Sequence, residues 1–199
     1  MAVLTVITFP PNGRSRGAPL LCAVLAAIVM GASAREAAAQ SVTAPELKAA
    51  FLFNFAKFAE WPADVVSLNS SLVLCVAGDG AVADALDKTV RGHQIDGHSV
   101  VIARGKVDSL PTCHVMYAAG LDAKETVRLL NSLKGLAVFT VSDREQFAQL
   151  GGVAYFFVEN GKMRFAINQD AAQRAHLTLS SKLLSLAKLV KDERNGSDH

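Results

Sequence analysis

The sequence predicts a three-layer α/β/α domain with a mainly parallel mixed sheet and a C-terminal β-hairpin followed by helices. Continuous apolar runs such as 72–77 and 136–141 are typical of strands buried on both faces, and segments of helical periodicity alternate with them. Near the C-terminus this alternation stops, and two apolar segments flank Asn160-Gly161, which is a strong hairpin signal.

The segment 46–62 is the first element and is expected to organise the core, because it holds four of the ten phenylalanines and the only tryptophan. One arc of the expected helix is apolar, and Pro62 is expected to end the helix at Trp61. Asn54 lies within this arc, so we expect it to be buried and hydrogen-bonded to neighbouring backbone. Phe53 lies among the charged positions, where it is either second-layer core or a contact for another protein. The apolar arc comprises Leu47, Phe51, Asn54, Phe55, Phe58 and Trp61.

The remaining elements follow from the same patterns. The middle of the chain predicts a strand at 72–77, a helix at 81–90, strands at 100–103 and 114–118, a helix at 126–134, a strand at 136–141 and a helix at 142–151. The last third predicts antiparallel strands at 153–158 and 163–168, a helix at 170–176, a brief extended stretch at 177–179, and a final helix that Ser180 caps and that holds Leu183, Leu184, Ala187 and Val190.

Residues 1–39 have the features of a secretory signal peptide, with a basic start, an apolar run and small residues before the expected cleavage site. The apolar run has about 13 residues, whereas a membrane-spanning helix needs about 20. Cleavage is expected after Ala34 or Ala39, and Ala39 is favoured. Residues 40–191 are then a single periplasmic domain, and 192–199 are expected to be a disordered tail.

The charge balance argues against a nucleic-acid partner. Of the 20 basic and 18 acidic residues, three and one lie within 1–39, so the remainder carries 17 of each and shows no basic stripe. The sequence also lacks metal-binding histidine spacing, a nucleophile elbow and a tight carboxylate pair. We therefore expect neither an enzyme nor a cofactor.

Cys75 and Cys113 are the two cysteines outside the expected signal peptide, and both lie in or beside predicted strands. Export to an oxidising compartment favours a disulfide between them. Two separate buried thiols are the alternative. His114 follows Cys113, but neighbouring strand residues point to opposite faces, so this pair is not expected to act as a nucleophile and base.

Three polar residues follow predicted strands. Asp79 comes after the strand at 72–77, and Ser142 and Asp143 come after the strand at 136–141. Because α/β folds bind ligands at the carboxyl edge of the sheet, these residues form a candidate small-ligand edge. The turn 78–83 also fits a G-x-G-x-x-A dinucleotide pattern, but a tight strand-to-helix turn explains it better in an exported protein.

Arg164, Arg174 and His176 lie in the predicted hairpin and in the helix that follows it. They are interpreted either as a polar rim for an anion or a protein partner, or as solvated surface. Solvated surface is the commoner explanation for such residues.

Five blocks of sequence, taken in order, resemble the YfiR family of small periplasmic proteins. They are 47–62 (LKAAFLFNFAKFAEWP), 74–79 (LCVAGD), 139–143 (FTVSD), 151–157 (GGVAYFF) and 165–187 (FAINQDAAQRAHLTLSSKLLSLA). The resemblance implies an exported α/β domain without enzymatic activity. It also implies one disulfide at the positions of Cys75 and Cys113. A second family disulfide has no counterpart here, since no cysteine follows Cys113.

The resemblance also implies a function. The best-known family member binds the periplasmic sensory part of an inner-membrane diguanylate cyclase and holds it inactive, and an outer-membrane lipoprotein sequesters that member. We therefore expect a non-enzymatic repressor of a membrane-bound signalling enzyme, with an influence on cyclic di-GMP and biofilm formation. The alternative is a periplasmic small-ligand binding, sensory or transport component. The oligomeric state is left open, a homodimer included. Candidate partner-binding residues are Phe53, Trp61, Arg164, Arg174 and His176.

Overall fold

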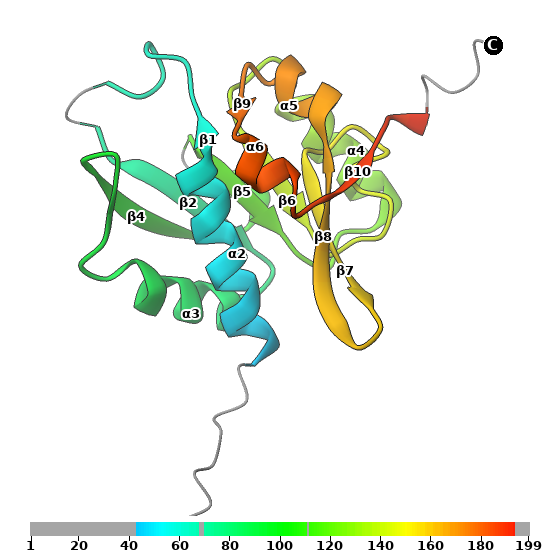
Figure 1. The fold of residues 1–199 in the computed structure, drawn as a ribbon, viewed down its shortest axis with the longest axis horizontal. Coiled ribbons are helices and arrows are strands. Elements are labelled where there is room, and N and C mark those ends of the chain that lie inside the picture. Colours follow the sequence, from blue (N-terminus) through cyan, green and yellow to red (C-terminus); the bar gives the residue numbers. More distant parts are fainter. Residues whose placement is uncertain (1–42, 68–69, 111, 194–199) are drawn as a thin grey trace, which may run out of the picture. The chain divides into compact units, whose positions relative to one another are not determined.

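The computed structural model describes residues 43–67, 70–110 and 112–193 (Figure 1). The signal peptide predicted for residues 1–39, with its cleavage after Ala34 or Ala39, lies outside these residues, as do residues 194–199. Within the described part of the chain, no helix is long and apolar enough to cross a membrane.

An eight-stranded mixed sheet forms the middle of the domain, in the order β10-β8-β7-β6-β5-β2-β4-β3. Neighbours from β7 to β4 are parallel, β8 is antiparallel to β7, β3 is antiparallel to β4, and β10 is parallel to β8. A separate antiparallel pair joins β1 to β9. The strands are β1 (Ala59–Glu60), β2 (Leu72–Ala77), β3 (Gln94–Ile95), β4 (His98–Gly105), β5 (Val115–Ala118), β6 (Phe139–Ser142), β7 (Ala154–Glu159), β8 (Lys162–Asn168), β9 (Thr178–Leu179) and β10 (Lys188–Val190).

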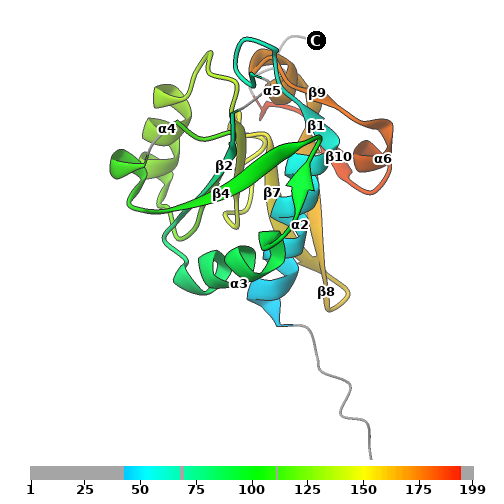
Figure 2. The same cartoon turned by 90° about the vertical axis from the view of Figure 1, so that its left-hand side faces the viewer.

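Helices cover both faces of this sheet, which confirms the predicted α/β fold (Figure 2). Val76 and Tyr117 face the core shared with α2 and α3, whereas their strand neighbours Ala77 and Ala118 pack with Leu129 of α4. Because side chains alternate along a strand, α4 lies on the opposite face from α2 and α3. The helices are α2 (Ala44–Phe58), α3 (Gly80–Val90), the short 3-10 helix η1 (Val107–Ser109), α4 (Ala123–Ser132), α5 (Gln169–Arg174) and α6 (Ser181–Leu184).

Phe55 of α2 lies at the centre of the main core. Its ring is fully buried and lies 5.1 Å from the ring of Phe139, 5.9 Å from that of Phe156 and 5.0 Å from that of Phe165, as measured between centroids. Aromatic pairs at these separations contribute about 0.5–1.5 kcal/mol beyond the burial of their area. The expectation that this helix organises the core is therefore confirmed.

The predicted apolar arc of this helix is nevertheless wrong in detail. The buried residues are Ala49, Leu52, Phe55 and Ala56, so the helix approaches the sheet closely through two alanines. Asn54, which was expected to be buried, is exposed and donates to the carbonyl of Ala50 within the same helix. The buried arc is therefore rotated away from Asn54.

The helix also ends earlier than predicted. It stops at Phe58, because Ala59 and Glu60 are extended and pair with β9. Trp61 therefore follows a short strand, and Pro62 is not the residue that ends the helix. A tertiary strand pairing has overridden the local helical pattern.

The helix predicted at 142–151 does not form. The chain follows a series of turns there, and Gln146 adopts a positive φ of 64°, which an α-helix does not permit. Phe147 is fully buried against Gly152, where any added Cβ would overlap the phenylalanine ring. The apolar pattern of this segment therefore arises from a loop whose Phe147 is buried on the α4 side of the sheet.

The final predicted helix is replaced by one helical turn and a strand. Only α6 is helical, and β10 then pairs with β8 in parallel. Asp192, two residues after β10, was predicted to begin a disordered tail and forms an ion pair of 2.8 Å with Arg174. The residues that follow α6 therefore extend the sheet at its edge.

Cys75 and Cys113 form a disulfide that links β2 to the start of β5. Their Cα atoms are 5.8 Å apart, and both residues are buried in a small cluster with Met116 and Val138. The predicted disulfide is present in the structure, and the alternative of two separate thiols is wrong.

Candidate functional site

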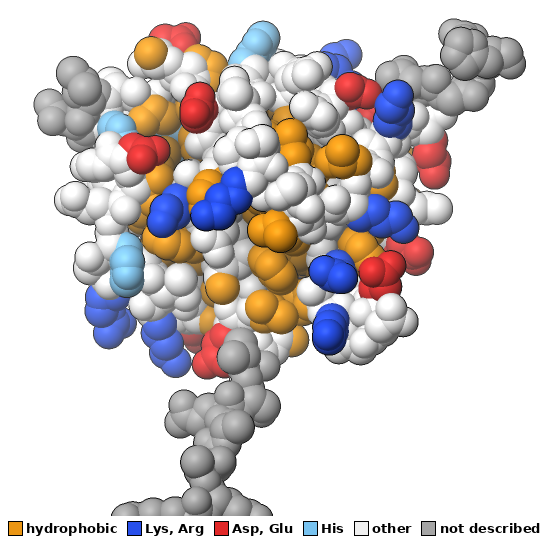
Figure 3. All heavy atoms as spheres, in the orientation of Figure 1, with side chains coloured by type: hydrophobic (Ala, Val, Ile, Leu, Met, Phe, Trp, Pro, Cys, Tyr) orange, Lys and Arg blue, Asp and Glu red, His pale blue; other side chains and the backbone are white. Residues whose placement is uncertain are grey.

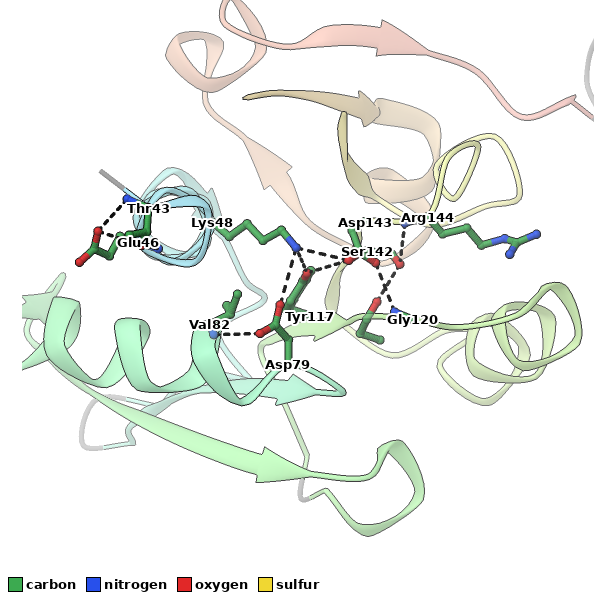
Figure 4. A network of polar contacts seen from close by, with 11 residues as sticks. Thr43, Glu46, Lys48, Asp79, Val82, Tyr117, Gly120, Ser142, Asp143 and Arg144 are labelled. Carbon is green, nitrogen blue, oxygen red and sulfur yellow. Dashed lines mark hydrogen bonds and ion pairs between the residues drawn. The ribbon is translucent and has the colours of Figure 1, made fainter. Parts of the chain in front are cut away.

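A polar network lies at the carboxyl edge of the sheet, where Lys48 of α2 reaches across the strand ends (Figure 4). Its ammonium group donates to the hydroxyl of Tyr117 at 2.7 Å and contacts Asp143 Oδ2 at 3.3 Å and Asp79 Oδ2 at 3.6 Å. The side chain of Lys48 is only 15% exposed. We call Lys48, Asp79, Tyr117 and Asp143 the carboxyl-edge network.

Each acidic residue is held by the backbone as well. Asp79 follows β2 and caps α3, with Oδ1 accepting from the amide of Val82 at 3.1 Å. Asp143 follows β6, and its Oδ1 accepts from the amide of Gly120 at 3.3 Å. Backbone hydrogen bonds therefore orient both carboxylates independently of Lys48.

Tyr117 stays a neutral phenol. Burial raises the pKa of its hydroxyl far above the usual value, and the negative charges of Asp143 and Asp79 raise this pKa further. The hydroxyl accepts from Lys48 and donates to Asp143 Oδ2 at 3.3 Å. It therefore relays a hydrogen bond from the cation to the carboxylate and is unsuited to act as a base.

Ser142 is fully buried and has a different role from the two carboxylates. Its hydroxyl donates to the carbonyl of Ala118 at 2.7 Å and accepts from the amide of Arg144 at 3.2 Å. The structure thus places Asp79, Ser142 and Asp143 near one edge, but the hydroxyl of Ser142 is already engaged in supporting the turn. Ligand binding by these three residues stays a prediction.

The chemistry of the network fits a structural clamp. One ammonium group is shared by two carboxylates and one phenol, and each of these groups has a partner within the protein. In the described residues, no group of three or more His, Cys, Asp or Glu side chains could hold a metal ion. The network therefore joins α2 to the ends of β2, β5 and β6.

Sequence reasoning found the two acidic residues of the network but missed Lys48 and Tyr117. A signal was present for Tyr117, since a tyrosine within a buried strand needs a partner for its hydroxyl. Lys48 gave no comparable signal, because a lysine on an amphipathic helix is usually solvated.

The candidate partner residues Phe53 and Trp61 are each half-buried. Phe53 packs against the core and lies edge-on to His93, with ring centroids 5.8 Å apart. Trp61 lies edge-on to His114 at 5.9 Å, and its indole N–H is buried without a hydrogen-bond partner in the described residues. Both interpretations of Phe53 therefore retain support, because its side chain packs against the core but is only half-buried.

The candidate residues Arg164, Arg174 and His176 are all exposed but do not form one rim. Arg164 lies 3.9 Å from Glu159 on the hairpin, whereas Arg174 pairs with Asp192 at the end of α5. His176 follows α5 with a positive φ of 55°. Their role in binding an anion or a partner stays a prediction.

Hydrophobic side chains gather between α2 and the β7–β8 hairpin (Figure 3). Val158 at the hairpin and Leu186 after α6 are 71% and 65% exposed. Leu186 also lines a cavity of about 230 Å³ with Phe157, Arg164 and Phe165. Phe51 of α2 lies 5.3 Å from Phe165 of the hairpin, measured between ring centroids, and Phe165 lines the cavity together with Leu186 and Ala187. We call this surface, formed by Phe51, Phe165, Leu186 and Ala187, the α2–hairpin seam.

Comparison with known families assigns the chain to one of them. A family model described as YfiR/HmsC-like matches residues 45–188, which is most of the described structure. The chain belongs to the YfiR/HmsC-like family. Members of this family are periplasmic regulators that interact with sensor proteins of that compartment, and the family is not known for enzymatic activity. The sequence-based resemblance is thereby confirmed.

Among solved structures, this YfiR/HmsC-like protein is similar to a conserved domain protein from Vibrio cholerae O1 biovar El Tor strain N16961. The two share 15% sequence identity with a TM-score of 0.49, over 75% of this chain and 60% of that one. The chain thus spans less than two thirds of that protein, and neither fold nor role is transferred from it.

Proposed function

We propose that this YfiR/HmsC-like protein represses a membrane-bound diguanylate cyclase by binding its periplasmic sensory domain. The observation that carries the proposal is the family match over residues 45–188, because it assigns nearly the whole folded domain to periplasmic regulators.

Repression of this kind requires that the protein bind one conformation of the receptor more tightly than the other. Shifting a receptor from 99% active to 99% inactive needs about 5.5 kcal/mol of differential binding free energy. Truncation of a hot-spot residue at the centre of an interface costs about 2 kcal/mol or more, so a few hot-spot residues can supply a difference of this size. Sequestration by an outer-membrane lipoprotein would then release the cyclase.

The α2–hairpin seam is the surface best suited to such a contact. Exposed apolar surface on a monomeric protein is a common sign of an interaction site, and the side chain of Leu186 is 65% exposed, whereas those of Phe53 and Trp61 are half-buried. Arg164 borders the same surface and adds a cation at its rim. Of these three predicted partner residues, Arg164 borders the seam, whereas Arg174 and His176 lie apart from it.

Binding to the purified periplasmic domain of the cyclase tests the proposal. We expect Leu186→Asp to weaken binding at least tenfold, since it removes an apolar contact and places a charged group in the interface. Leu136→Asp is the matched control, because Leu136 is 49% exposed and lies before β6, outside the seam. Absence of binding by the wild-type protein to the periplasmic domains of all cyclases in its host would refute the proposed function.

A further inference from the structure

A second site lies at the same edge of the sheet but on its α4 side. A cavity of about 450 Å³ opens at the carboxyl ends of β2, β4 and β5, and the carboxyl-edge network does not line it. This volume is within the range of small-molecule sites, which is about 300–1,000 Å³. Its walls are η1 and α4, and its lining residues include Lys106, Val107, Leu121, Arg128 and Leu129.

The position of the cavity follows from the topology of the sheet. From β2 the chain passes through α3 to β4 on one side, and from β5 it passes through α4 to β6 on the other side. The adjacent strands β2 and β5 therefore form a topological switch point, which is where open α/β sheets bind ligands. The cavity opens at this crevice.

Glycine allows two backbone segments to approach each other closely beside the cavity. Gly78 follows β2 with a positive φ of 80°, and an added Cβ would lie 2.5 Å from the carbonyl oxygen of Ala119. The close approach of these two backbone segments is therefore possible only with glycine at this position. Gly120 follows β5 and also has a positive φ, of 67°.

The charges around the cavity favour an anion. Lys106 and Arg128 are exposed at its rim, and neither forms an ion pair within residues 43–67, 70–110 and 112–193. The carboxylate of Glu125 is already engaged, because it accepts from the amide of Asp122 at 2.9 Å in the capping box of α4. Asp108 is the one remaining acidic residue in the lining. The lining therefore holds two cations and two carboxylates, and the Glu125 carboxylate is engaged at the N-terminus of α4, where the helix dipole partly offsets its charge.

We propose that this cavity binds a small organic anion, such as a carboxylate, that carries an apolar ring or chain. Lys106 and Arg128 receive the anionic group at the rim. Val107, Leu121 and Leu129 contact the apolar part. This site is independent of the proposed repression and uses none of the residues of the α2–hairpin seam.

Titration of the purified protein with 2-naphthoate tests the site, and neutral 2-naphthamide of nearly the same shape is the control ligand. We expect naphthoate to bind at least about tenfold more tightly than the amide, because only the carboxylate attracts both cations. Arg128→Gln and Lys106→Gln should each weaken naphthoate binding about threefold to fivefold, as expected for partly exposed charge pairs. Binding of the amide should stay unchanged in both variants.

Lys124→Gln is the matched control variant, since Lys124 is exposed on the same helix one turn before Arg128 and does not line the cavity. It should bind naphthoate as the wild type does. No binding of naphthoate up to about 5 mM, equal affinity for the amide, or unchanged affinity in both cavity variants would overturn the proposal. These outcomes are separate from receptor binding, which the same variants should leave intact.

Discussion

Replacement of Lys48 by methionine tests the role assigned to the carboxyl-edge network. Methionine retains the apolar stem but removes the ammonium group, so Asp79 and Asp143 lose their shared cation and Tyr117 loses a donor. The substitution therefore leaves two partly buried carboxylates that repel each other.

The magnitude follows from the burial of the three charged side chains. Exposed ion pairs contribute about 0–1 kcal/mol, whereas breaking a buried pair costs about 3–5 kcal/mol. The side chains of Lys48, Asp79 and Asp143 are 15%, 23% and 35% exposed, which places the network between these limits. We expect Lys48→Met to lower the free energy of unfolding by about 2–3 kcal/mol and the melting temperature by roughly 4–12 °C.

Urea unfolding followed by circular dichroism measures this loss. Lys57→Met is the matched control, because Lys57 is an exposed lysine of the same helix and forms no ion pair in the described residues. Adding Asp143→Asn to Lys48→Met should recover part of the loss by removing the repulsion. A loss below about 0.5 kcal/mol for Lys48→Met, or an equal loss for Lys57→Met, would refute the clamp.

Three further predictions concern stability. Replacing Cys75 and Cys113 by serine should lower the free energy of unfolding by roughly 4 kcal/mol, because the disulfide joins residues 38 positions apart in the sequence. The fully reduced wild type should match this variant in thermal unfolding. Burial lowers the pKa of His114 below its value of about 6.5 in the unfolded chain, so the unfolded state binds more protons and stability should fall as the pH falls below about 6.5. Fluorescence of the single tryptophan, Trp61, reports this transition, and His114→Asn should flatten the pH dependence. Phe53→Asp should cost about 1–3 kcal/mol, because the ring packs partly against the core; loss of repression at unchanged stability would show instead that Phe53 acts only as a contact.

The central strands could be predicted because their sequences are mostly apolar. Strands such as β2 and β6 are buried on both faces, so their pattern depends little on neighbouring elements. The hairpin could be predicted as well, because Asn160 and Gly161 both adopt the positive φ that the turn requires. These local signals agree with the final structure.

The C-terminal elements could not be predicted because their structure depends on partners distant in sequence. Leu183, Leu184, Ala187 and Val190 have helical spacing, yet the chain after α6 extends because the outer edge of β8 is available for pairing. Likewise, the helical pattern near Phe147 gave way to a loop that fills the α4 side of the core. Tertiary packing decided both cases.

The candidate site could be predicted only in part. The rule that parallel strands end at one edge located Asp79 and Asp143, because each directly follows its strand. The reach of Lys48 across this edge depends on the crossing of α2 over the sheet, which no local pattern contains. The α4-side cavity also depends on the approach of β2 and β5 through Gly78 and Ala119.

Cellular cyclic di-GMP in a clean deletion strain, compared with its complemented parent, tests the proposed repression most directly. The account predicts a rise on deletion that is reversed by the full chain but not by a version lacking residues 1–39, because that version would stay outside the periplasm. Unchanged cyclic di-GMP across several growth conditions would contradict the proposed control of a diguanylate cyclase.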